Sequence, residues 1–421
     1  MHIVHVVQLY HPVASGSVRY FIEIGKRLVR DGHRVTVLTT TAHDLESLWR
    51  ADKRTLPAGS ELHEGCQILR FPVQRLLDWP LFYPIMRRLL CELGRLRLPV
   101  ALLRWMSSLS PTAPALVTWL REHADEIDVI HVTNVTLDGL IHPVLRIAQQ
   151  AQIPVLTTPF VHLGEMHDPA FVRYYSMPQQ LDILQRSDAV FTMTHREAIF
   201  LQQHGVTTPL HVIGAGVTPH EVMGGDAEAF RQRHAITGPI CLQVGAMARD
   251  KGTITTVQAL RLLWAQGRDI TLVLIGAPLA HFSDYLATLP DTDRARIRVL
   301  AYASDDERRD AYAAASVFML PSRTDSFGIV FLEAWCNHLP VIGADAGGIP
   351  DVVHDGINGV LVPFANETAL AHAIAGLLDD PAGAQHLAQH GYDSVIAHDT
   401  WDHVYARICT HYDKACARHA D

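Results

Sequence analysis

The sequence has few cysteines, and they follow no recognisable pattern. Among its 421 residues there are six, with no Cys-x-x-Cys pair and no spacing typical of a disulfide framework. We therefore expect a reducing compartment and no zinc site built from thiolates. The six are Cys66, Cys91, Cys241, Cys336, Cys409 and Cys416.

The sequence also has no long hydrophobic run and no excess of positive charge. No uninterrupted apolar stretch approaches the roughly 18 residues of a membrane-spanning helix. The first residues, "MHIVHVVQLYHP", lack the basic segment of a secretory signal. The formal charge of −9 argues against a nucleic-acid partner, because phosphate backbones are held by Lys and Arg. These absences predict a cytoplasmic protein.

What the sequence has in quantity is apolar residues, 48% of the total, in a chain too long for one compact core. Short β-branched runs alternate with longer helical patterns, which predicts an α/β fold of two Rossmann-like, doubly wound parallel-sheet domains. The strands predicted for the first domain are residues 2–9, 34–40, 128–132, 154–158 and 189–193. Those of the second are residues 240–245, 270–276, 297–300, 317–320, 340–343 and 360–362.

A glycine-rich stretch at residues 214–225 is the natural linker between the two domains. We expect domains at 1–213 and 214–398, and a C-terminal helix at 399–421 that packs back on the N-terminal domain. Two such sheets facing each other create a cleft lined by the carboxyl ends of strands and the amino ends of helices. Helix amino ends favour phosphate, so this architecture predicts a phosphorylated ligand.

One segment, residues 70–121, breaks the alternation. It holds eight arginines against two acidic residues, a local charge of +6 in an acidic chain, with large apolar side chains between them. Such a basic, amphipathic insert is typical of an element that lies on an anionic membrane, and the alternative is a helical lid packed on its own domain. The arginines are Arg70, Arg75, Arg87, Arg88, Arg95, Arg97, Arg104 and Arg121.

Two carboxylates flank an apolar stretch in "LPSRTDSFGIVFLEAW". They are Asp325 and Glu333, and residues 329–335 have the pattern of a helix. One interpretation makes Asp325 the helix N-cap and Glu333 a solvated helix residue. The other gives both carboxylates to a ligand, with the backbone of the Ser-Phe-Gly between them.

Further glycine-containing turns follow predicted strands. Gly16 opens a helix after the first strand, where a bare backbone can approach a diphosphate. In "LQVGAMARDKGTI", Gly245 ends a strand and Lys251 stands at a helix start, where its ammonium could reach a phosphate with support from Arg249. Gly347 and Gly348 form another exposed turn. Each feature alone also has an ordinary structural explanation.

Together these segments resemble the retaining, nucleotide-sugar-dependent glycosyltransferases of family 4, which have the GT-B fold. The likeness covers nearly the whole chain and is most specific in "DSFGIVFLEAW" and "GGIPDVVHDGINGVLV". It extends to "RDGHRVTVLTT", "SDAVFTMTHREAIFLQQHGV", "VGAMARDKG" and "TWDHVYARI". The insert at 70–121 lies outside it. The resemblance implies transfer of a sugar from a nucleoside-diphosphate sugar to a hydroxyl acceptor with retention of configuration.

The resemblance also implies a role for each residue of the "DSFG" block. Glu333 would hydrogen-bond the ribose hydroxyls. Asp325 would contact the donor sugar, at a position where the family usually has Glu. The amides of Ser326, Phe327 and Gly328 would hold the diphosphate.

Other expected donor contacts come from three further segments. Lys251 would neutralise the leaving diphosphate, and in "VLTTPFVHLGE" His162 would lie beside the donor sugar as the histidine of the N-terminal domain. Gly16 matches the second glycine of the family's first loop, and a serine replaces the first. After Gly245 the family arginine is replaced by Ala246, so Arg249 would have to supply that charge.

No metal or other cofactor is expected. His162, Glu165 and His167 could be read as metal ligands, but their spacing is not His-Glu-x-x-His. Asp291 and Asp293 resemble the metal-binding Asp-x-Asp of a different glycosyltransferase fold, although the polar segment around them is more typical of solvated surface.

Two alternative functions stay open at this point. One is a nucleotide-sugar epimerase on the same scaffold, and the other is a nucleotide-sugar-binding protein with weak or no catalysis. The acceptor could be a lipid-linked compound or a glycan. An insert that binds anionic membrane would place the protein on the cytosolic membrane face.

Overall fold

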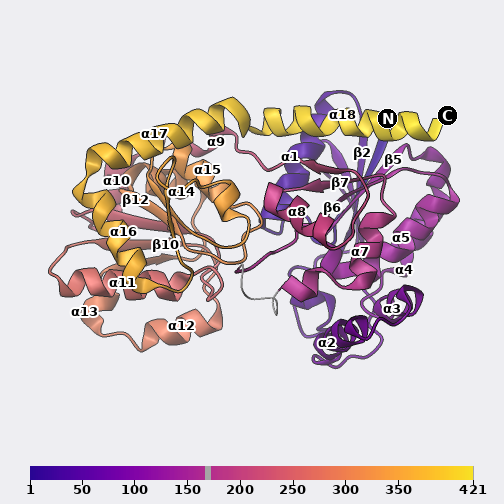
Figure 1. The fold of residues 1–421 in the computed structure, drawn as a ribbon, viewed down its shortest axis with the longest axis horizontal. Helices are drawn as coiled ribbons and strands as arrows, with labels where there is room; N and C mark the ends of the chain where they lie inside the picture. The colour runs from indigo at the N-terminus through magenta and orange to yellow at the C-terminus, as the bar shows by residue number, and fades with distance from the viewer. Residues whose placement is uncertain (166–171, 421) are drawn as a thin grey trace. The chain divides into compact units, whose positions relative to one another are not determined.

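The computed structural model describes residues 1–165 and 172–420, which form two compact units (Figure 1). Unit 1 comprises residues 1–161, 172–213 and 405–420, and unit 2 comprises residues 162–165 and 214–404. Each unit is a mainly parallel sheet with helices on both faces, so the predicted α/β fold with two Rossmann-like sheets is confirmed.

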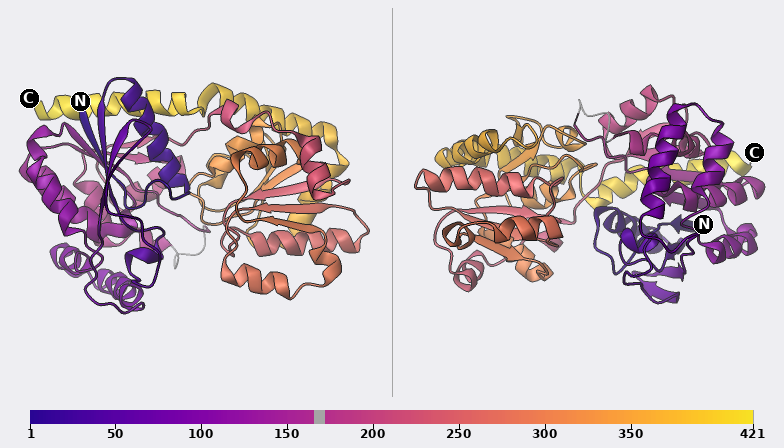
Figure 2. Two further views of the ribbon diagram at one scale, coloured as in Figure 1. Left: turned by 180° about the vertical axis from the view of Figure 1, so that it is seen from behind. Right: turned by 90° about the horizontal axis from the view of Figure 1, so that it is seen from below.

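Unit 1 is built on an eight-stranded sheet in the order β3-β4-β2-β1-β5-β6-β7-β8. Most of this unit is the indigo-to-magenta part of the ribbon in Figure 2. All neighbouring strands are parallel except the pair at one edge, β3 and β4, which is antiparallel. The strands are β1 (His2–Val6), β2 (Arg34–Thr40), β3 (Gly59–His63), β4 (Cys66–Phe71), β5 (Val129–Thr133), β6 (Val155–Thr158), β7 (Ala189–Thr192) and β8 (Leu210–Val212).

The helices of unit 1 include three, α2 to α4, that form the insert after β4. The α-helices are α1 (Gly16–Arg30), α2 (Phe82–Arg95), α3 (Val100–Ser107), α4 (Pro114–Glu122), α5 (Asp138–Gln150), α7 (Pro178–Gln185) and α8 (His195–Gln203). Short 3₁₀ turns are η1 (Glu46–Leu48), η2 (Ala124–Glu126), η3 (Val135–Leu137) and η4 (Arg173–Tyr175).

Sequence patterns did not predict β3, β4 or β8. β3 has the sequence "GSELH" and is exposed along almost its whole length, so it lacks the apolar alternation that marks a strand. β4 does alternate between buried and exposed residues. Its member Arg70, which the sequence assigned to the basic insert, therefore belongs to the sheet and pairs with Glu61 of β3.

Unit 2 is built on a six-stranded parallel sheet in the order β11-β10-β9-β12-β13-β14. Alternate residues of its strands enter two separate cores, one on each face: Ile240 and Leu242 face one, and Cys241 faces the other. The strands are β9 (Ile240–Val244), β10 (Thr271–Ile275), β11 (Ile297–Leu300), β12 (Val317–Leu320), β13 (Val341–Ala344) and β14 (Val360–Val362).

Helices cover both faces of this sheet, with α11 and α16 on the face of Cys241 and α10, α14 and α15 on the other. They are α9 (Pro219–Val222), α10 (Ala227–His234), α11 (Thr253–Ala265), α12 (Ala280–Ala287), α13 (Asp291–Arg294), α14 (Asp305–Ala314), α15 (Ile329–Cys336), α16 (Glu367–Asp379) and α17 (Pro381–His398), with a 3₁₀ turn η5 (Ile349–Asp351).

The last helix, α18 (Trp401–Ala420), contributes residues to both units. Its first turn, to Val404, belongs to unit 2, and residues 405–420 belong to unit 1. In unit 1 the buried Tyr412 hydroxyl lies 3.2 Å from Nε2 of His5 in β1 and 2.6 Å from Nδ1 of His131 in β5. Burial lowers the pKa of His5 to about 3, so this contact joins neutral rings.

Candidate functional site

Three loops of unit 2 carry most of the predicted site residues. They follow the neighbouring strands β9, β12 and β13 and span residues 245–252, 321–328 and 345–348. Because the carboxyl ends of parallel strands lie at one edge of a sheet, the three loops meet there. This is the edge at which open α/β sheets bind ligands.

Two glycines allow these loops to touch. Gly252 has φ +69°, and a Cβ on it would lie 2.2 Å from the carbonyl oxygen of Pro321. Gly347 has φ +61°, and its Cβ would lie 2.7 Å from the carbonyl oxygen of Asp325. The same carbonyl accepts a hydrogen bond of 2.8 Å from the Gly348 amide. Glycine is therefore required at Gly252 and Gly347, where one loop contacts the next.

Lys251 and Asp325 form an ion pair between the first two loops. The Lys251 ammonium donates to both carboxylate oxygens, at 2.8 and 2.9 Å, and the side chains are 26% and 16% exposed. Burial alone would raise the pKa of Asp325, but Lys251 more than offsets this, so the pKa is lowered. At neutral pH the two charges are held together at the loop edge.

His162 stands beside this pair, grouped with unit 2 although the sequence places it after β6 of unit 1. Its Nδ1 lies 3.0 Å from the Ser326 hydroxyl. Burial and the nearby Lys251 ammonium lower its pKa to about 4, so the ring is neutral at pH 7. Gly164, two residues later, accepts a hydrogen bond from the Gly347 amide. The segment that carries His162 is thus fixed to the third loop.

Glu333 lies on α15 and is buried, 9% exposed, which corrects the interpretation of a solvated helix residue. The Tyr312 hydroxyl of α14 donates to its Oε2 at 2.8 Å. The Arg308 guanidinium of the same helix lies 3.8 Å from its Oε1. Burial and the Glu333 carboxylate raise the pKa of Tyr312, so its hydroxyl keeps the proton it donates. Sequence reasoning missed both partners, because nothing local links α14 to α15.

The start of α15 corrects the N-cap interpretation of Asp325. The capping position belongs to Gly328, whose φ of +91° and contact with the Phe331 ring exclude a side chain. Within the described part of the chain, no backbone oxygen accepts a hydrogen bond from the amides of residues 326–330. Phe327 packs partly on the core of unit 2. The amides at this helix start are therefore donors without a backbone acceptor.

The first loop places Gly245 and Arg249 differently. Gly245 has φ +143°, and its amide donates to Ile275 of β10. Arg249 is exposed, and its backbone amide donates to the ring of His281 at 2.8 Å. A cation that the sequence analysis did not single out, Arg323, lies in the second loop and pairs with Asp250 at 2.7 Å. In the sequence, only its position two residues before Asp325 indicated that Arg323 could belong to the site.

Gly16 is the predicted donor residue that belongs to unit 1. It is the first residue of α1, and Ser15 before it is the N-cap, whose hydroxyl accepts from the Val18 amide at 3.3 Å. Both residues are exposed. A Cβ on Gly16 would meet no atom within 4 Å, so the fold of unit 1 leaves room at this turn.

The described residues contain no group of three His, Cys, Asp or Glu side chains that could hold a metal ion. Of the three candidate ligands, Glu165 pairs with Arg323 at 3.3 Å, and His167 lies outside the described residues. Asp293 pairs with Arg261 at 2.7 Å, and Asp291 pairs with Arg294 of its own helix. Both carboxylates of the Asp-x-Asp pair are thus engaged in ion pairs, one within α13 and one with α11.

Two family models match the chain in succession. The model for the glycosyl transferase 4-like domain matches residues 15–216, and the model for glycosyl transferases group 1 matches residues 226–394. The insert helices fall inside the first match, and all three loops of unit 2 fall inside the second.

Curated relatives carry glycosyltransferase names. The D-inositol 3-phosphate glycosyltransferase of Thermobispora bispora is 26% identical over 96% of this chain and 91% of its own length. The alpha-maltose-1-phosphate synthase of Mycobacterium tuberculosis is 32% identical over 42% of this chain. That match spans 49% of the synthase, about half the length of the relative.

Solved structures show the same fold over the whole chain. Sucrose-phosphate synthase from Thermosynechococcus elongatus has a TM-score of 0.73 at 22% identity, covering 99% of both chains. HepE of Anabaena in complex with UDP has a TM-score of 0.71 at 19% identity, covering 98% of this chain and 100% of its own. At these identities the likeness establishes the fold. Among the described residues, no helix has the length and apolarity needed to cross a bilayer.

Proposed function

We propose that this chain, which belongs to the group 1 glycosyltransferases of the GT-B fold, transfers a sugar from a nucleoside-diphosphate sugar to a hydroxyl acceptor with retention of configuration. The observation that carries the proposal is the Lys251–Asp325 ion pair next to the α15 amides. An ammonium and several unpaired amides at one loop edge suit a diphosphate, and a carboxylate beside them suits a sugar hydroxyl.

The donor would bind by an exchange of partners. Its diphosphate would take the Lys251 ammonium from Asp325 and accept hydrogen bonds from the amides of residues 326–330. The freed Asp325 carboxylate would then accept a hydrogen bond from a hydroxyl of the donor sugar. Glu333, whose Oε1 is 3.8 Å from Arg308, keeps acceptor capacity for the ribose hydroxyls.

During transfer, negative charge would build on the departing diphosphate as the glycosidic bond loosens. Lys251 and the α15 amides would lie where that charge develops, so they would stabilise the transition state. His162 would be neutral at pH 7 and able to hydrogen-bond a sugar hydroxyl or the reacting centre. A front-face attack, with the leaving phosphate taking the acceptor's proton, accounts for retention without a second carboxylate as nucleophile.

In this proposal no metal is needed, since an ammonium and backbone dipoles supply the positive charge. Turnover should then persist in excess EDTA. A loss of activity that Mg²⁺ or Mn²⁺ restores would contradict this part of the proposal.

The test of donor binding is a thermal-shift panel of nucleotides and nucleotide sugars. UDP and its sugars come first, because HepE was solved with UDP. A ligand at 100 times its dissociation constant stabilises by about 2.7 kcal/mol, which is readily measured. If no nucleoside diphosphate or nucleotide sugar shifts the melting temperature, the proposal fails.

The reaction class has its own tests. NMR of the product should show the donor's anomeric configuration, and an inverted anomer would overturn retention. Donor alone should give no new sugar epimer, because an epimerase would need further acid and base groups near the sugar. A wild-type protein that binds nucleotide sugar but transfers to no acceptor would instead be a binding protein.

The acceptor we propose is a lipid-linked compound or a glycan with a free hydroxyl. The protein would work in the cytoplasm and at the cytosolic face of a membrane, with no nucleic-acid partner. Screening lipid and glycan acceptors with the donor found in the thermal-shift panel would distinguish the two acceptor classes.

A further inference from the structure

The insert helices α2 and α3 present large apolar side chains to solvent. Of the seventeen large hydrophobic side chains exposed among the described residues, nine lie between residues 76 and 105, and each of these is between 40% and 72% exposed. Two of them, Ile85 and Leu89, lie one turn apart on α2, and Leu81 and Leu96 are the capping residues at its two ends. The nine are Leu76, Leu77, Trp79, Leu81, Ile85, Leu89, Leu96, Leu102 and Trp105; they are called the outer surface below.

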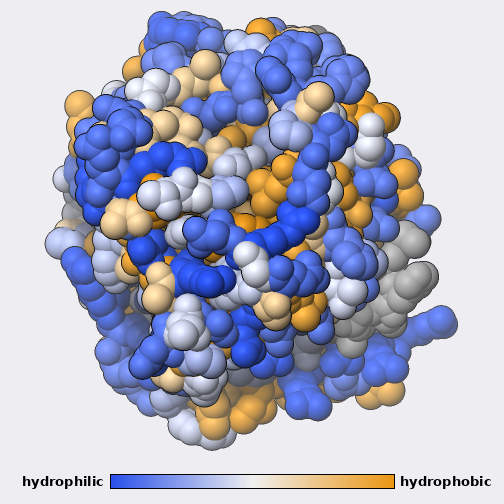
Figure 3. Space-filling view, turned by 90° about the vertical axis from the view of Figure 1, so that its left-hand side faces the viewer, coloured by the Kyte–Doolittle hydropathy of each residue, from blue (hydrophilic) through white to orange (hydrophobic). Residues whose placement is uncertain are grey.

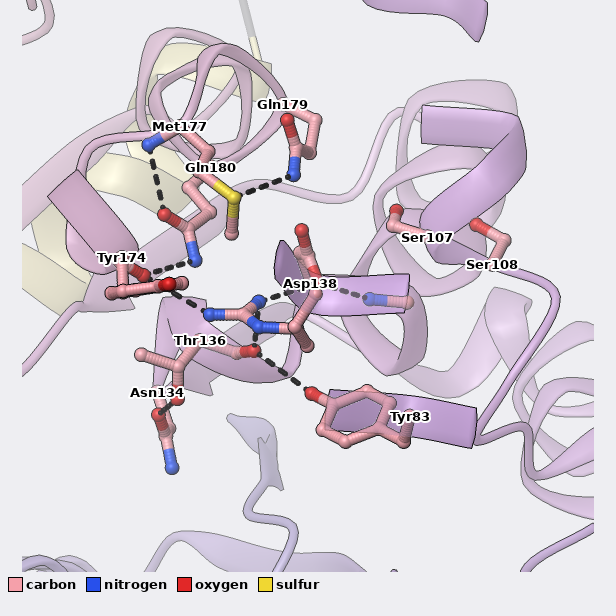
Figure 4. Close-up of polar contacts among 12 residues, drawn as sticks. Tyr83, Ser107, Ser108, Asn134, Thr136, Asp138, Tyr174, Met177, Gln179 and Gln180 are labelled. Atoms are coloured by element: carbon pink, nitrogen blue, oxygen red, sulfur yellow. Dashed lines mark hydrogen bonds and ion pairs between the residues drawn. The ribbon is translucent and has the colours of Figure 1, made fainter. Parts of the chain in front are cut away.

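The opposite face of α2 is anchored to unit 1 (Figure 4). The Arg87 guanidinium donates to the carbonyl oxygens of Thr136 at 2.6 Å and Tyr174 at 3.0 Å, and lies 3.4 Å from Asp138. Tyr83 of α2 adds a hydroxyl that donates to the same Thr136 oxygen at 3.4 Å. The helix therefore already packs on unit 1 through a buried, hydrogen-bonded face. The exposed side chains of the outer surface are on its other side and are not needed for that packing.

A second anchor lies on α3, which packs against α2. Its Leu103 is fully buried, and Arg104 pairs with Asp182 of α7 at 3.2 Å. Arg70, Arg87 and Arg104 are all paired within unit 1. The insert therefore exposes much less positive charge than the formal +6 counted from its sequence. That part of the expectation is corrected.

The exposed charges around the outer surface nearly balance. Between residues 76 and 105 three arginines and two acidic residues are exposed, a net charge of +1. Arg88 adjoins Leu89, and Arg97 adjoins Leu96, so a cation borders the apolar stripe at two places. Trp79 and Trp105, in the same segment of the chain, are also exposed, by 49% and 61%. Leucines bordered by Arg and Trp are typical of a surface at the boundary between lipid headgroups and acyl chains.

Other exposed parts of the chain differ from this one. Over the face of unit 2 formed by α10, α13 and α16, hydrophilic residues predominate and hydrophobic ones form small separate groups (Figure 3). The eight remaining exposed hydrophobic side chains are spread along the chain from Leu45 to Ile396. Isolated ones need no partner, whereas the concentration of nine within residues 76–105 indicates an interaction surface.

We propose that the outer surface of α2 and α3 binds an anionic lipid bilayer, with both helices lying in the headgroup plane and the apolar side chains inserted. The hold is mainly apolar, because the exposed charge is only +1, and the bordering arginines select anionic headgroups. The inference extends the proposed function, since it brings the transferase to a membrane-borne acceptor, but the binding itself does not depend on turnover.

The experiment is co-sedimentation of the full chain with vesicles of phosphatidylcholine and phosphatidylglycerol. The test variant is Ile85→Glu/Leu89→Glu, two exposed positions on α2. The matched control is Leu62→Glu/Leu262→Glu, which adds the same charges at exposed leucines on β3 and α11. Wild type and control should bind alike, and the test variant about tenfold or more weakly, because it loses inserted side chains and repels the lipid.

Salt and nucleotide separate the possible failures. Binding should fall by less than about tenfold between roughly 0.1 and 0.5 M NaCl, since an apolar hold is weakly screened. Wild type, test variant and control should have the same melting temperature and the same thermal shift with nucleotide. Vesicle binding is measured without nucleotide, so its result stands even if the donor-binding test fails. The proposal is overturned if wild type stays unbound, if the test variant binds as well as wild type, or if salt abolishes binding. It is also overturned if wild type without vesicles is a dimer that the test variant dissociates.

Discussion

The exchange of partners at Lys251 can be tested through charge. If a nucleoside diphosphate takes the ammonium from Asp325, the carboxylate opposes diphosphate binding whenever no sugar is attached. We therefore expect Lys251→Ala to weaken binding of the free nucleoside diphosphate, Asp325→Asn to strengthen it, and the double variant to lie between Lys251→Ala and wild type.

The sizes follow from the geometry of the pair. A charge-assisted hydrogen bond to phosphate is worth about 2 kcal/mol, and loss of Lys251 also leaves Asp325 uncompensated, for about 1 kcal/mol more. At 1.4 kcal/mol per factor of ten, Lys251→Ala should raise the dissociation constant about 100-fold, and the double variant, which loses only the bond to phosphate, about 30-fold. Asp325→Asn should lower it about threefold, since Lys251 no longer leaves a partner at 2.8 Å.

Isothermal titration calorimetry with the diphosphate that gives the largest thermal shift measures all four proteins. Lys53→Ala is a matched control, because it removes another paired lysine, bonded to Glu46 in unit 1. Its affinity should equal that of wild type. The reasoning is refuted if Asp325→Asn weakens binding, or if the double variant binds no better than Lys251→Ala.

Three further predictions concern the groups around this pair. Tyr312→Phe should lower the free energy of unfolding by about 2 kcal/mol in urea denaturation, because the buried Glu333 loses its 2.8 Å donor; an unchanged value would mean the carboxylate has another partner. Gly347→Ala should lower the free energy of unfolding by about 3 kcal/mol, because of its φ of +61° and its overlap with the second loop. Gly356→Ala, with φ +70° and open space around it, should lower it by only about 1 kcal/mol. Equal decreases would show that the loop contact is unimportant. The pKa of His162 is lowered to about 4, so its neutral form stabilises the fold above pH ~6.5, and this contribution, about 2 kcal/mol, is lost as the pH falls towards 4; wild type should therefore lose more stability than His162→Gln between pH 7 and 4.5, and parallel curves would contradict the assignment.

Strand patterns predicted the sheets well because both sheets are buried on two faces. The predicted bounds of β2, β11, β12 and β14 match those observed, since each is a β-branched or apolar run between polar turns. The exposed edge strand β3 gave no such signal, and it was missed. The insert was recognised by composition, but only tertiary contacts show that Arg87 faces inward while Ile85 faces solvent.

The sequence named the residues of the candidate site, but it did not indicate which of them contact one another. Glycines and carboxylates after strand ends pointed to Lys251, Asp325 and Glu333 because βα loops have a regular position in parallel sheets. Sequence spacing carries no information on which side chains pair across loops. The pairing of Lys251 with Asp325, and the approach of Tyr312 to Glu333 from another helix, therefore had to come from the structure.

The hydroxyl of Tyr412 lies between His5 and His131, and this contact affects when unit 1 can finish folding during synthesis. Unit 1 contains β1 and is completed by residues 405–420, which are made after the residues of unit 2. A nascent chain can assemble strands β1 to β8 early, yet the imidazoles of His5 and His131 lack their Tyr412 contact until α18 has emerged. A fusion or truncation that disturbs α18 would therefore first affect β1, about 400 residues away in sequence.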